Sequence, residues 1–187
     1  MTTKFKTYAG IGSRNIGEHE KSLIAVLANA LSDRYIVLSG NAHGADYNFH
    51  KNSKGNTIVF CHKQYNKEHL NDFEYKMQIA DCLPEAYASV EQFHPVGDTL
   101  NQYVKGLMAR NYHIIMGYDK IPRSEFVLYV ASENIRGEVS GGTGQGARIA
   151  DHYGIPRFNI RLFLEKGIIK DNTPECIINI LTDNQLL

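Results

Sequence analysis

Short apolar runs alternate with amphipathic stretches along most of the chain. The runs at residues 35–38, 57–61 and 126–131 have the length and apolar content of strands that are covered on both faces. Between such runs, apolar residues recur at helical spacing, as at positions 23, 26, 27, 30 and 31. Strands that alternate with helices imply right-handed crossovers, so the pattern predicts an α/β fold with a mostly parallel sheet and helices on both faces.

The second half of the chain continues this pattern. An apolar stripe at residues 100–108 predicts a helix that is capped by Asp98 or Thr99 and that ends near Arg110 and Asn111. A helix at residues 147–153 is predicted to end at Gly154, because glycine is common just beyond a helix end. The last strand is predicted at residues 155–160.

Two regions depart from the alternation. Residues 62–95 are rich in His, Tyr, Asn and acids and only weakly helical through Leu70, Phe73, Met77 and Ala80, which predicts an insertion that packs on the sheet edge or covers the site. Residues 161–187 are predicted to form a short C-terminal docking segment with a helix after Pro174. Because linkers, repeats and low-complexity tracts are absent, residues 1–187 are predicted to form a single domain.

Charge and cysteine content narrow the function classes. The chain has 20 Lys plus Arg and 20 Asp plus Glu, so no broad basic surface for nucleic acid is expected. Cys61, Cys82 and Cys176 lie far apart and form no C-x-x-C pair, which indicates a reducing compartment and argues against structural zinc. The sequence shows no apolar signal segment and no run long enough to cross a bilayer. We therefore expect a cytoplasmic protein with no membrane partner.

Residues 140–150 carry most of the candidate chemistry. Gly141, Gly142, Gly144 and Gly146 follow a predicted strand and lead into a predicted helix. Glycines suit a turn that needs positive φ and close backbone approach, and the free N–H groups at a helix start attract a phosphate. The segment is neither a Walker A motif nor a strict G-x-G-x-x-G. We interpret it as a phosphate-binding loop; the alternative is a tight turn without a ligand.

Two further glycine-containing loops, at residues 9–14 and 39–46, also follow predicted strands. Arg14 beside the first loop either reaches a phosphate or stays in solvent. In the second loop, Ser39 and Asn41 either donate to a phosphate or cap the next helix, and capping is the simpler role. Asp46 either accepts from a ribose hydroxyl or interacts favourably with the helix dipole.

A metal site has weak support in the sequence. His43, Asp46 and His50 fall on one possible helix face, but no third firm ligand or H-E-x-x-H arrangement accompanies them. We predict no metal ion and no cofactor.

Four short motifs in order resemble a known family. They are A-G-I-G-S-R at residues 9–14, L-S-G-N-A-H-G-A-D at 38–46, A-R-N at 109–111 and G-G-T-G-Q-G at 141–146. In combination they resemble the superfamily that unites the DNA-processing protein DprA/Smf with the LOG nucleotide hydrolases. The resemblance covers roughly residues 7–160. It implies a Rossmann-like three-layer sandwich, a phosphate site at the matching loops, a homo-oligomer that pairs through helices, and a bacterial or phage source.

The two branches of this superfamily match different loops. Residues 39–46 are similar to the S-G-x-A-x-G-I-D stretch of the DprA branch, and Arg110 with Asn111 is similar to its Arg-Asn pair. The last loop is similar to the LOG motif P-G-G-x-G-T-x-x-E, but Arg148 stands at the position of the catalytic glutamate. A guanidinium cannot replace a carboxylate as a base, so hydrolysis of the LOG type is not expected. Arg148 is instead predicted either to reach a phosphate at the helix start or to be a solvated helix residue.

Three functions follow from these observations. The leading hypothesis is a sensor or sequestering protein that binds a small phosphorylated nucleotide or nucleotide-derived signal. The first alternative, implied by the resemblance, is a DprA-type recombination mediator that binds single-stranded DNA. The second is a nucleotide N-glycosidase or phosphohydrolase that uses Asp46, Glu133 or Glu138 in place of the missing glutamate.

The predicted ligand-binding residues come from the three glycine loops and the Arg-Asn pair. They are Gly10, Gly12, Ser13, Arg14, Ser39, Gly40, Asn41, Ala42, Gly44, Asp46, Arg110, Asn111, Gly141, Gly142, Thr143, Gly144, Gln145, Gly146 and Arg148. The phosphate interpretation requires that these loops converge at one edge of the sheet.

Overall fold

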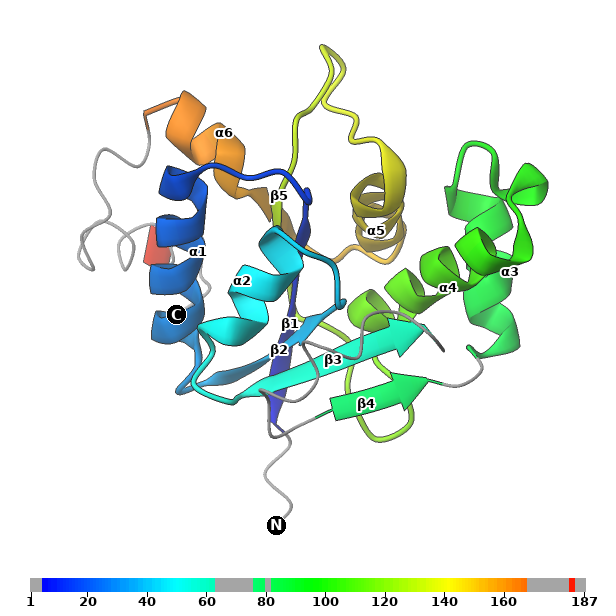
Figure 1. Cartoon of the computed structure of the whole chain (residues 1–187), viewed down its shortest axis with the longest axis horizontal. Coiled ribbons are helices and arrows are strands. Elements are labelled where there is room, and N and C mark those ends of the chain that lie inside the picture. Colours follow the sequence, from blue (N-terminus) through cyan, green and yellow to red (C-terminus); the bar gives the residue numbers. More distant parts are fainter. Residues whose placement is uncertain (1–4, 63–75, 80–81, 168–181, 184–187) are drawn as a thin grey trace.

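A parallel sheet forms the centre of the molecule (Figure 1). The computed structural model describes residues 5–62, 76–79, 82–167 and 182–183, and within them six strands lie in the order β4-β3-β2-β1-β5-β6. Every neighbouring pair in this sheet is parallel. The α/β prediction with a mostly parallel sheet is therefore confirmed.

The elements follow one another in the expected alternation. In chain order they are β1 (Lys6–Gly12), α1 (Glu18–Leu31), β2 (Tyr35–Ser39), α2 (Ala45–Lys51), β3 (Thr57–His62), β4 (Lys76–Ile79), α3 (Pro84–Phe93), the 3-10 turn η2 (Gly97–Thr99), α4 (Gln102–Met116), β5 (Val127–Val130), α5 (Gly141–His152), β6 (Arg157–Asn159) and α6 (Ile160–Glu165).

Consecutive residues of a strand point to opposite sides of the sheet. Because the strands are apolar on both sides, helices cover both faces. Tyr8 and Leu128 belong to a buried cluster with α1, α2 and α6, whereas Ala9 and Tyr129 belong to a second buried cluster with α3, α4 and α5. Figure 1 shows the same two layers, with α1, α2 and α6 on one side and α3, α4 and α5 on the other. This arrangement is the three-layer sandwich that the resemblance implies.

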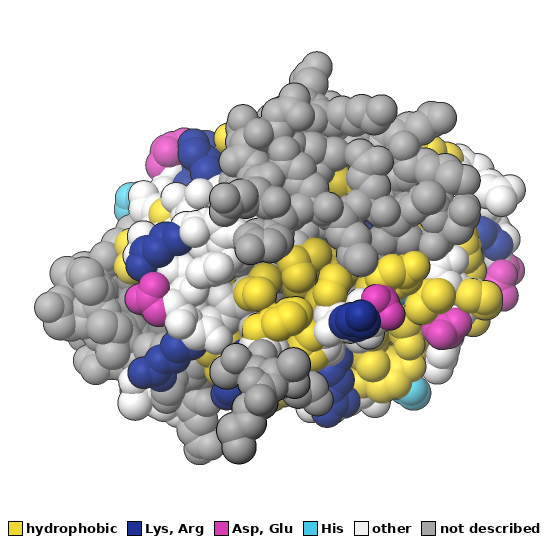
Figure 2. Space-filling model, turned by 90° about the horizontal axis from the view of Figure 1, so that it is seen from below, with side chains coloured by type: hydrophobic (Ala, Val, Ile, Leu, Met, Phe, Trp, Pro, Cys, Tyr) yellow, Lys and Arg dark blue, Asp and Glu magenta, His cyan; other side chains and the backbone are white. Residues whose placement is uncertain are grey.

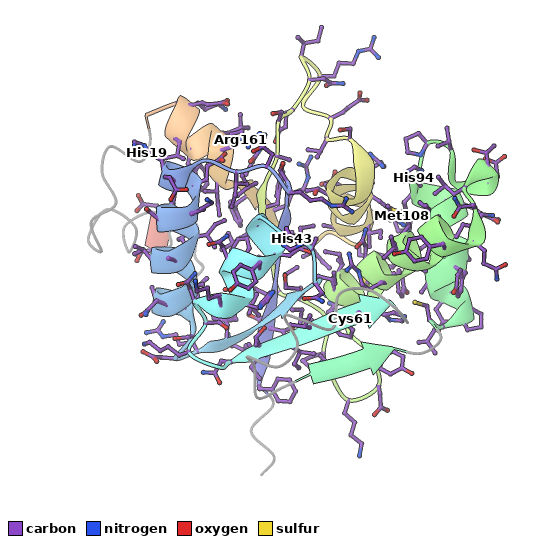
Figure 3. The ribbon with its side chains drawn as sticks, in the orientation of Figure 1. His19, His43, Cys61, His94, Met108 and Arg161 are labelled. Carbon is purple, nitrogen blue, oxygen red and sulfur yellow. The ribbon has the colours of Figure 1, made fainter. Side chains whose placement is uncertain are left out.

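An ion pair joins the first helix to the last described one. The Arg161 guanidinium of α6 lies 2.6 Å from the Glu20 carboxylate of α1, and Figure 3 shows Arg161 beside these two helices. The other Glu20 oxygen accepts a 2.7 Å hydrogen bond from the Gly17 N–H at the start of α1. The hydrogen bonds from Arg161 and Gly17 lower the pKa of Glu20 against the opposing effect of its burial.

The chain reverses direction across the sheet at β1. From β1 it proceeds to β2 and β3 on one side, and it later returns to place β5 on the other side of β1. Parallel sheets bind ligands at such a switch point, outside the carboxyl ends of the strands. The loops after β1, β2 and β5 all lie at this end of the sheet, so the topology places the three glycine-containing segments near one another.

Several predicted boundaries are wrong. Helix α4 begins after Asn101, whose side chain accepts a 2.9 Å hydrogen bond from the Val104 N–H, and Asp98 and Thr99 lie in η2 instead. The helix runs past Arg110 and Asn111 to Met116, because the first residue with a conformation that ends it is Gly117 at φ 75°. The polar pair therefore lies in the middle of a helix.

The region predicted as an insertion contains one strand of the sheet and one helix that packs on the sheet. Met77, expected in a weak helix, lies in β4, which extends the parallel sheet beside β3. Leu70, Phe73 and Ala80 lie outside the described residues. Residues 84–93 form α3, which begins with Pro84 in the first turn, where a missing N–H costs little.

The structure describes only part of the C-terminal region for which predictions were made. Residue 160, expected in a strand, begins α6 because Asn159 caps the helix by accepting a 3.2 Å hydrogen bond from the Arg161 N–H. The helix predicted after Pro174 lies outside the described residues.

The described part of the surface at the end where β1 begins shows no large basic area. Figure 2 shows hydrophobic side chains there, with Lys and Arg in small groups among acidic and uncharged neighbours. None of the described helices is both long and apolar enough for a membrane span.

Candidate functional site

A pocket of about 280 Å³ opens at the carboxyl end of β1. We call it the central pocket. It is lined by residues from the loops after β1 and β2, from α4 and from the start of α5, namely Ile11, Gly12, Ser13, Arg14, Ala42, Asp46, Leu107, Met108, Arg110, Asn111, Ser140, Gly141, Gly142 and Thr143. The three glycine-containing segments converge here as the phosphate interpretation requires.

The last glycine segment is not a loop but the first turns of α5. The helix begins at Gly141, which adopts a left-handed φ of 64° after the extended residue Ser140. The first hydrogen bond of the helix is donated by the Gly144 N–H to the Ser140 carbonyl, over 3.1 Å. The N–H groups of Gly141, Gly142 and Thr143 therefore have no acceptor within the helix.

This helix start also lacks the usual side-chain partners. The Ser140 side chain makes no capping hydrogen bond, and no acidic residue lies in the first turn of α5. The positive end of the helix dipole thus faces the central pocket without a neutralising side chain from its own helix. Such an end favours an anion.

Arg110 brings a buried cation to the same pocket. Its side chain is on α4, the residue is only 8 % exposed, and its Nε and Nη1 atoms are buried with no hydrogen-bond partner among the described residues. Nη2 donates to Asn111 Oδ1 over 3.1 Å. Buried donors without acceptors are costly in a folded protein, so an anionic ligand is the simplest partner for this guanidinium.

Asn111 connects α4 to the start of α5. Its amide nitrogen donates to the Gly142 carbonyl over 3.2 Å and to Gln145 Oε1 over 3.3 Å. These bonds hold the first turn of α5 against the helix that carries Arg110. Asn111 therefore positions the pocket wall as well as lining it.

Among the residues that the structure describes, Asp46 is the one acidic residue that lines the central pocket. It is 4 % exposed, and its Oδ1 accepts a 3.1 Å hydrogen bond from the Gly12 N–H. Burial raises the pKa of the Asp46 carboxyl to about 6, against the opposing effects of Arg110 and of the Gly12 and Ala42 backbone N–H groups. Near neutral pH the carboxylate therefore partly offsets the charge of Arg110, and below pH 6 the pocket becomes more positive.

Replacement of Asp46 by Asn should remove a pH dependence of stability. Since folding raises the pKa from 3.8 to about 6, the wild-type free energy of unfolding should fall as pH rises through this window. The fall is at most about 3 kcal/mol for a shift of this size. Urea unfolding at several pH values between about 4 and 8 should show Asp46→Asn gaining stability relative to wild type as pH rises; a difference that does not change with pH would contradict this assignment.

Several predicted residues around the second loop support the pocket without lining it. Ser39 is fully buried and donates to the Gly10 carbonyl, so it joins β2 to β1 and caps no helix. Gly44 occupies the N-cap position of α2 with a φ of 86°. Asn41 is buried and does not line the central pocket.

Two predicted glycines permit close packing under the site. A Cβ atom on Gly40 would lie 2.4 Å from Asp46 Oδ2 and 2.8 Å from Arg110 Nη1, so the absence of a side chain lets these two groups approach. A Cβ atom on Gly10 would lie 2.5 Å from the Phe49 ring. Close packing therefore explains why glycine occupies both positions, without any contact to a ligand.

The later residues of the α5 segment also face away from the central pocket. Gly144 packs against the Val139 carbonyl, and Gly146 packs against the Ile11 side chain. Gln145 is fully buried, and its Oε1 accepts from Asn111.

Arg148 does not reach the central pocket, contrary to the phosphate-reaching role predicted for it. The helix begins earlier than expected, so Arg148 is two turns from its start and is not among the residues that line the pocket. Its Nε donates to the Phe93 carbonyl at the end of α3, and its Nη1 donates to the Val139 carbonyl over 3.2 Å. Burial lowers the pKa of this guanidinium. Arg148 thus joins α3 to α5.

The apolar wall of the pocket could not be predicted from the sequence. Leu107 and Met108 were placed in a helical stripe that packs on the sheet, yet both line the central pocket from α4. Figure 3 shows Met108 on α4, and its sulfur lies close to Gly142 at the start of α5. Helical periodicity alone gives no signal that separates a pocket wall from a core stripe.

The other acids suggested for catalysis lie elsewhere. Glu133 and Glu138 line a second, open groove of about 790 Å³ on the other side of the α5 start, which we call the side groove. Glu133 Oε1 accepts hydrogen bonds from Tyr129 Oη over 2.8 Å and from Asn159 Nδ2 over 2.7 Å. Its carboxylate therefore anchors the chain that follows β5. Among the described residues, no three His, Cys, Asp or Glu side chains gather in a way that could hold a metal ion.

Comparison with known proteins identifies the fold. No family model matches the chain, and no curated protein matches it. Among solved structures, it is similar to DNA processing protein A (DprA) from Helicobacter pylori, with a TM-score of 0.63 over 97 % of this chain and 82 % of that chain. The chain has a DprA-like fold.

A second DprA structure agrees with the first. The DprA-like fold also matches DprA from Streptococcus pneumoniae, with a TM-score of 0.55 over 96 % of this chain and 57 % of that longer chain. Both matches have 20 % sequence identity, so they establish the fold and not the function. The Rossmann-like fold that the loop sequences imply is confirmed at this level.

Proposed function

We propose that this protein binds the phosphate group of a nucleotide in the central pocket and acts as a sensor or sequestering protein. The observation that carries the proposal is the buried Arg110 guanidinium, whose Nε and Nη1 lack partners, in the wall of the pocket that also receives the uncapped start of α5. A phosphate accepts hydrogen bonds from a guanidinium and from helix N–H groups together. Arg14, exposed at the same pocket, adds a second cation.

The rest of the pocket suits the nucleoside part of such a ligand. Leu107, Met108 and Ile11 provide an apolar wall, and Ser13 and Thr143 provide hydroxyl groups near it. Pockets for small ligands combine apolar surface with a few polar groups in this way, and about 280 Å³ lies just below their usual range. We therefore expect one nucleotide unit inside the pocket.

Single-stranded DNA is the second candidate ligand. The Helicobacter pylori DprA that shares this fold is described as having a unique single-stranded DNA binding mode. The balanced charge of the present chain argues for few phosphate contacts, since each neutralised phosphate requires a cation. On this candidate, one backbone phosphate of the strand would occupy the central pocket. Either ligand would use the same anion site.

Isothermal titration with inorganic phosphate, AMP and adenosine tests the leading proposal. We expect AMP and phosphate to bind and adenosine to bind much more weakly. Arg14→Gln should weaken AMP binding by about threefold to tenfold, the usual effect of one charge-assisted hydrogen bond. Arg34→Gln is the matched control, because Arg34 is also exposed but lies at the amino end of β2, away from the pocket.

Titration of the same proteins with an oligothymidylate at several salt concentrations distinguishes a nucleotide ligand from single-stranded DNA. Oligonucleotide binding that weakens steeply with salt, without AMP binding, would replace the nucleotide proposal with the DNA candidate. No binding of phosphate, AMP or oligonucleotide would overturn both. The homo-oligomer expected from the resemblance stays a prediction that light scattering can check.

A further inference from the structure

The central pocket combines groups that favour an anion with a carboxyl group that does not. Arg110, Arg14 and the uncapped start of α5 all favour a negative charge, yet Asp46 lines the same pocket and is only 4 % exposed. A carboxylate beside a bound phosphate weakens binding by charge repulsion. The phosphate site alone therefore does not account for an acid at this position.

The hydrogen bond that joins Asp46 to β1 does not require an acid either. Asp46 Oδ1 accepts a 3.1 Å hydrogen bond from the Gly12 N–H, which ties the start of α2 to the end of β1. The side-chain oxygen of an asparagine would accept the same bond, because an amide oxygen is also an acceptor. What the carboxyl group adds is a proton that it can gain or lose.

The second oxygen of this carboxyl group lies close to the unpaired end of Arg110. Asp46 Oδ2 and Arg110 Nη1 lie 2.4 and 2.8 Å from the same point, the position that a Cβ atom on Gly40 would occupy. Nη1 nevertheless has no hydrogen-bond partner among the described residues, so no hydrogen bond joins it to the carboxylate. An anion bound to Arg110 in this pocket would therefore lie beside the Asp46 carboxyl group.

Asp46 is the titratable acid that such an anion would meet. Among the described residues, the other charged side chains that line the pocket are Arg110 from α4 and Arg14 from the loop after β1, and the start of α5 contributes none. Cys61 of β3 lies near Arg110, but burial raises the pKa of its thiol to about 11, so it stays neutral. His43, in the loop before α2, does not line the pocket.

A phosphate monoester and Asp46 would ionise in the same pH range. Burial raises the pKa of Asp46 to about 6, and the second pKa of a phosphate monoester is also about 6. Two like-charged groups in contact cannot both stay ionised, so a proton is retained between them. That proton forms a charge-assisted hydrogen bond from one group to the other, and attraction replaces repulsion.

We propose that Asp46 and the bound phosphate share one proton in the central pocket. This inference rests on the proposed function and deepens it, because it defines the class of anion that the pocket accepts: one that brings a proton or that takes one up from solvent. Inorganic phosphate retains a P–OH group at mildly alkaline pH and brings its own proton. AMP and sulfate carry none there, so each requires one proton from solvent, and acid strengthens their binding.

The test compares inorganic phosphate, sulfate and AMP at about pH 7.5 and 8.5, above the pKa values of both partners, in wild type, Asp46→Asn and Asp33→Asn. Phosphate and sulfate have the same shape and differ in the proton. Asp33 is an exposed acid between α1 and β2, so its substitution removes the same charge away from the pocket. Isothermal titration in two buffers of different ionisation enthalpy gives the affinity and the number of protons taken up.

For the wild type, we expect the affinity for AMP and sulfate to fall by about tenfold between the two pH values, with about one proton taken up per ligand. The affinity for inorganic phosphate should change by less than about twofold, because no proton is taken up. Asp46→Asn should lose the proton uptake and, at the higher pH, should bind sulfate at least about tenfold more tightly than wild type, because the repulsion is removed. Asp33→Asn should match the wild type throughout.

An AMP affinity that does not change with pH in the wild type would overturn the inference, as would an unchanged proton uptake in Asp46→Asn. The wild-type comparison of phosphate with sulfate decides the question even if Asp46→Asn does not fold. If all three anions bind with the same pH dependence, the phosphate site stands and the shared proton is wrong. The proposed function fails separately, and the inference with it, if the wild type binds neither inorganic phosphate nor AMP at either pH.

Discussion

Gly144→Ala is expected to destabilise the protein by about 3 kcal/mol or more, or to prevent folding. A Cβ atom at this position would lie 1.9 Å from the Val139 carbonyl oxygen and 2.6 Å from the carbonyl carbon. Both are backbone atoms, so no side-chain rotation can relieve the overlap. The same carbonyl accepts the hydrogen bond from Arg148, and a shift of α5 away from it would also break that bond.

Gly142→Ala is the matched control for this substitution. It lies in the same first turn of α5, but a Cβ atom there would first meet the Asn111 amide nitrogen at 3.1 Å, which is the end of a side chain. Because alanine favours a helix over glycine by roughly 1 kcal/mol, Gly142→Ala should remain within about 1 kcal/mol of wild type. Urea unfolding followed by circular dichroism measures both variants. A Gly144→Ala protein as stable as Gly142→Ala would show that α5 does not pack against Val139 as described.

Among the described strands, β1, β2, β3, β5 and β6 could be predicted from the hydrophobic pattern, whereas β4 could not. Short apolar runs such as residues 35–38 have the length of covered strands, and parallel connections place their carboxyl ends at one edge. This reasoning was sufficient to bring the loops after β1, β2 and β5 to one pocket. The convergence of Arg14, Asp46 and Gly142 therefore follows from topology and not from any single motif.

Helix ends were predicted less well because tertiary contacts decide them. Four glycines in six positions favour a loop on local propensity, yet Gly144 and Gly146 lie inside α5, where the Val139 carbonyl and the Ile11 side chain leave no space for a Cβ atom. The earlier start of the helix also places Arg148 two turns beyond the pocket. A helix start predicted at residue 147 and found at Gly141 thus changed the predicted role of Arg148.

The burial of Arg110 beside the pocket could not be predicted from the local sequence pattern. A polar pair after an apolar stripe indicates the end of a helix, but Arg110 and Asn111 are buried in the middle of α4. Nothing in the local pattern shows that a pocket beside the helix accommodates them. The resemblance to the DprA branch marked these residues as candidates where periodicity did not.

Arg110→Met should weaken phosphate and AMP binding by about tenfold to a hundredfold, the range expected for loss of hydrogen bonds to a charged group. Methionine retains much of the aliphatic volume and removes the charge and the donors. Arg34→Met makes the same chemical change at an exposed site away from the pocket and should bind like wild type. Titration calorimetry with inorganic phosphate and AMP measures the three proteins.

The stability of Arg110→Met should distinguish a ligand-binding role from a structural one. At about pH 5, below the Asp46 pKa of about 6, the carboxyl is mostly neutral, and removal of a buried guanidinium with unpaired Nε and Nη1 should leave stability unchanged or higher. At pH 8 the ionised Asp46 loses the cation that lowers its pKa, so the variant should become less stable relative to wild type as pH rises. Urea unfolding at the two pH values decides between these roles: a large destabilisation already at pH 5 would mean that Arg110 holds the fold together and that its unpaired donors are not kept for an anion.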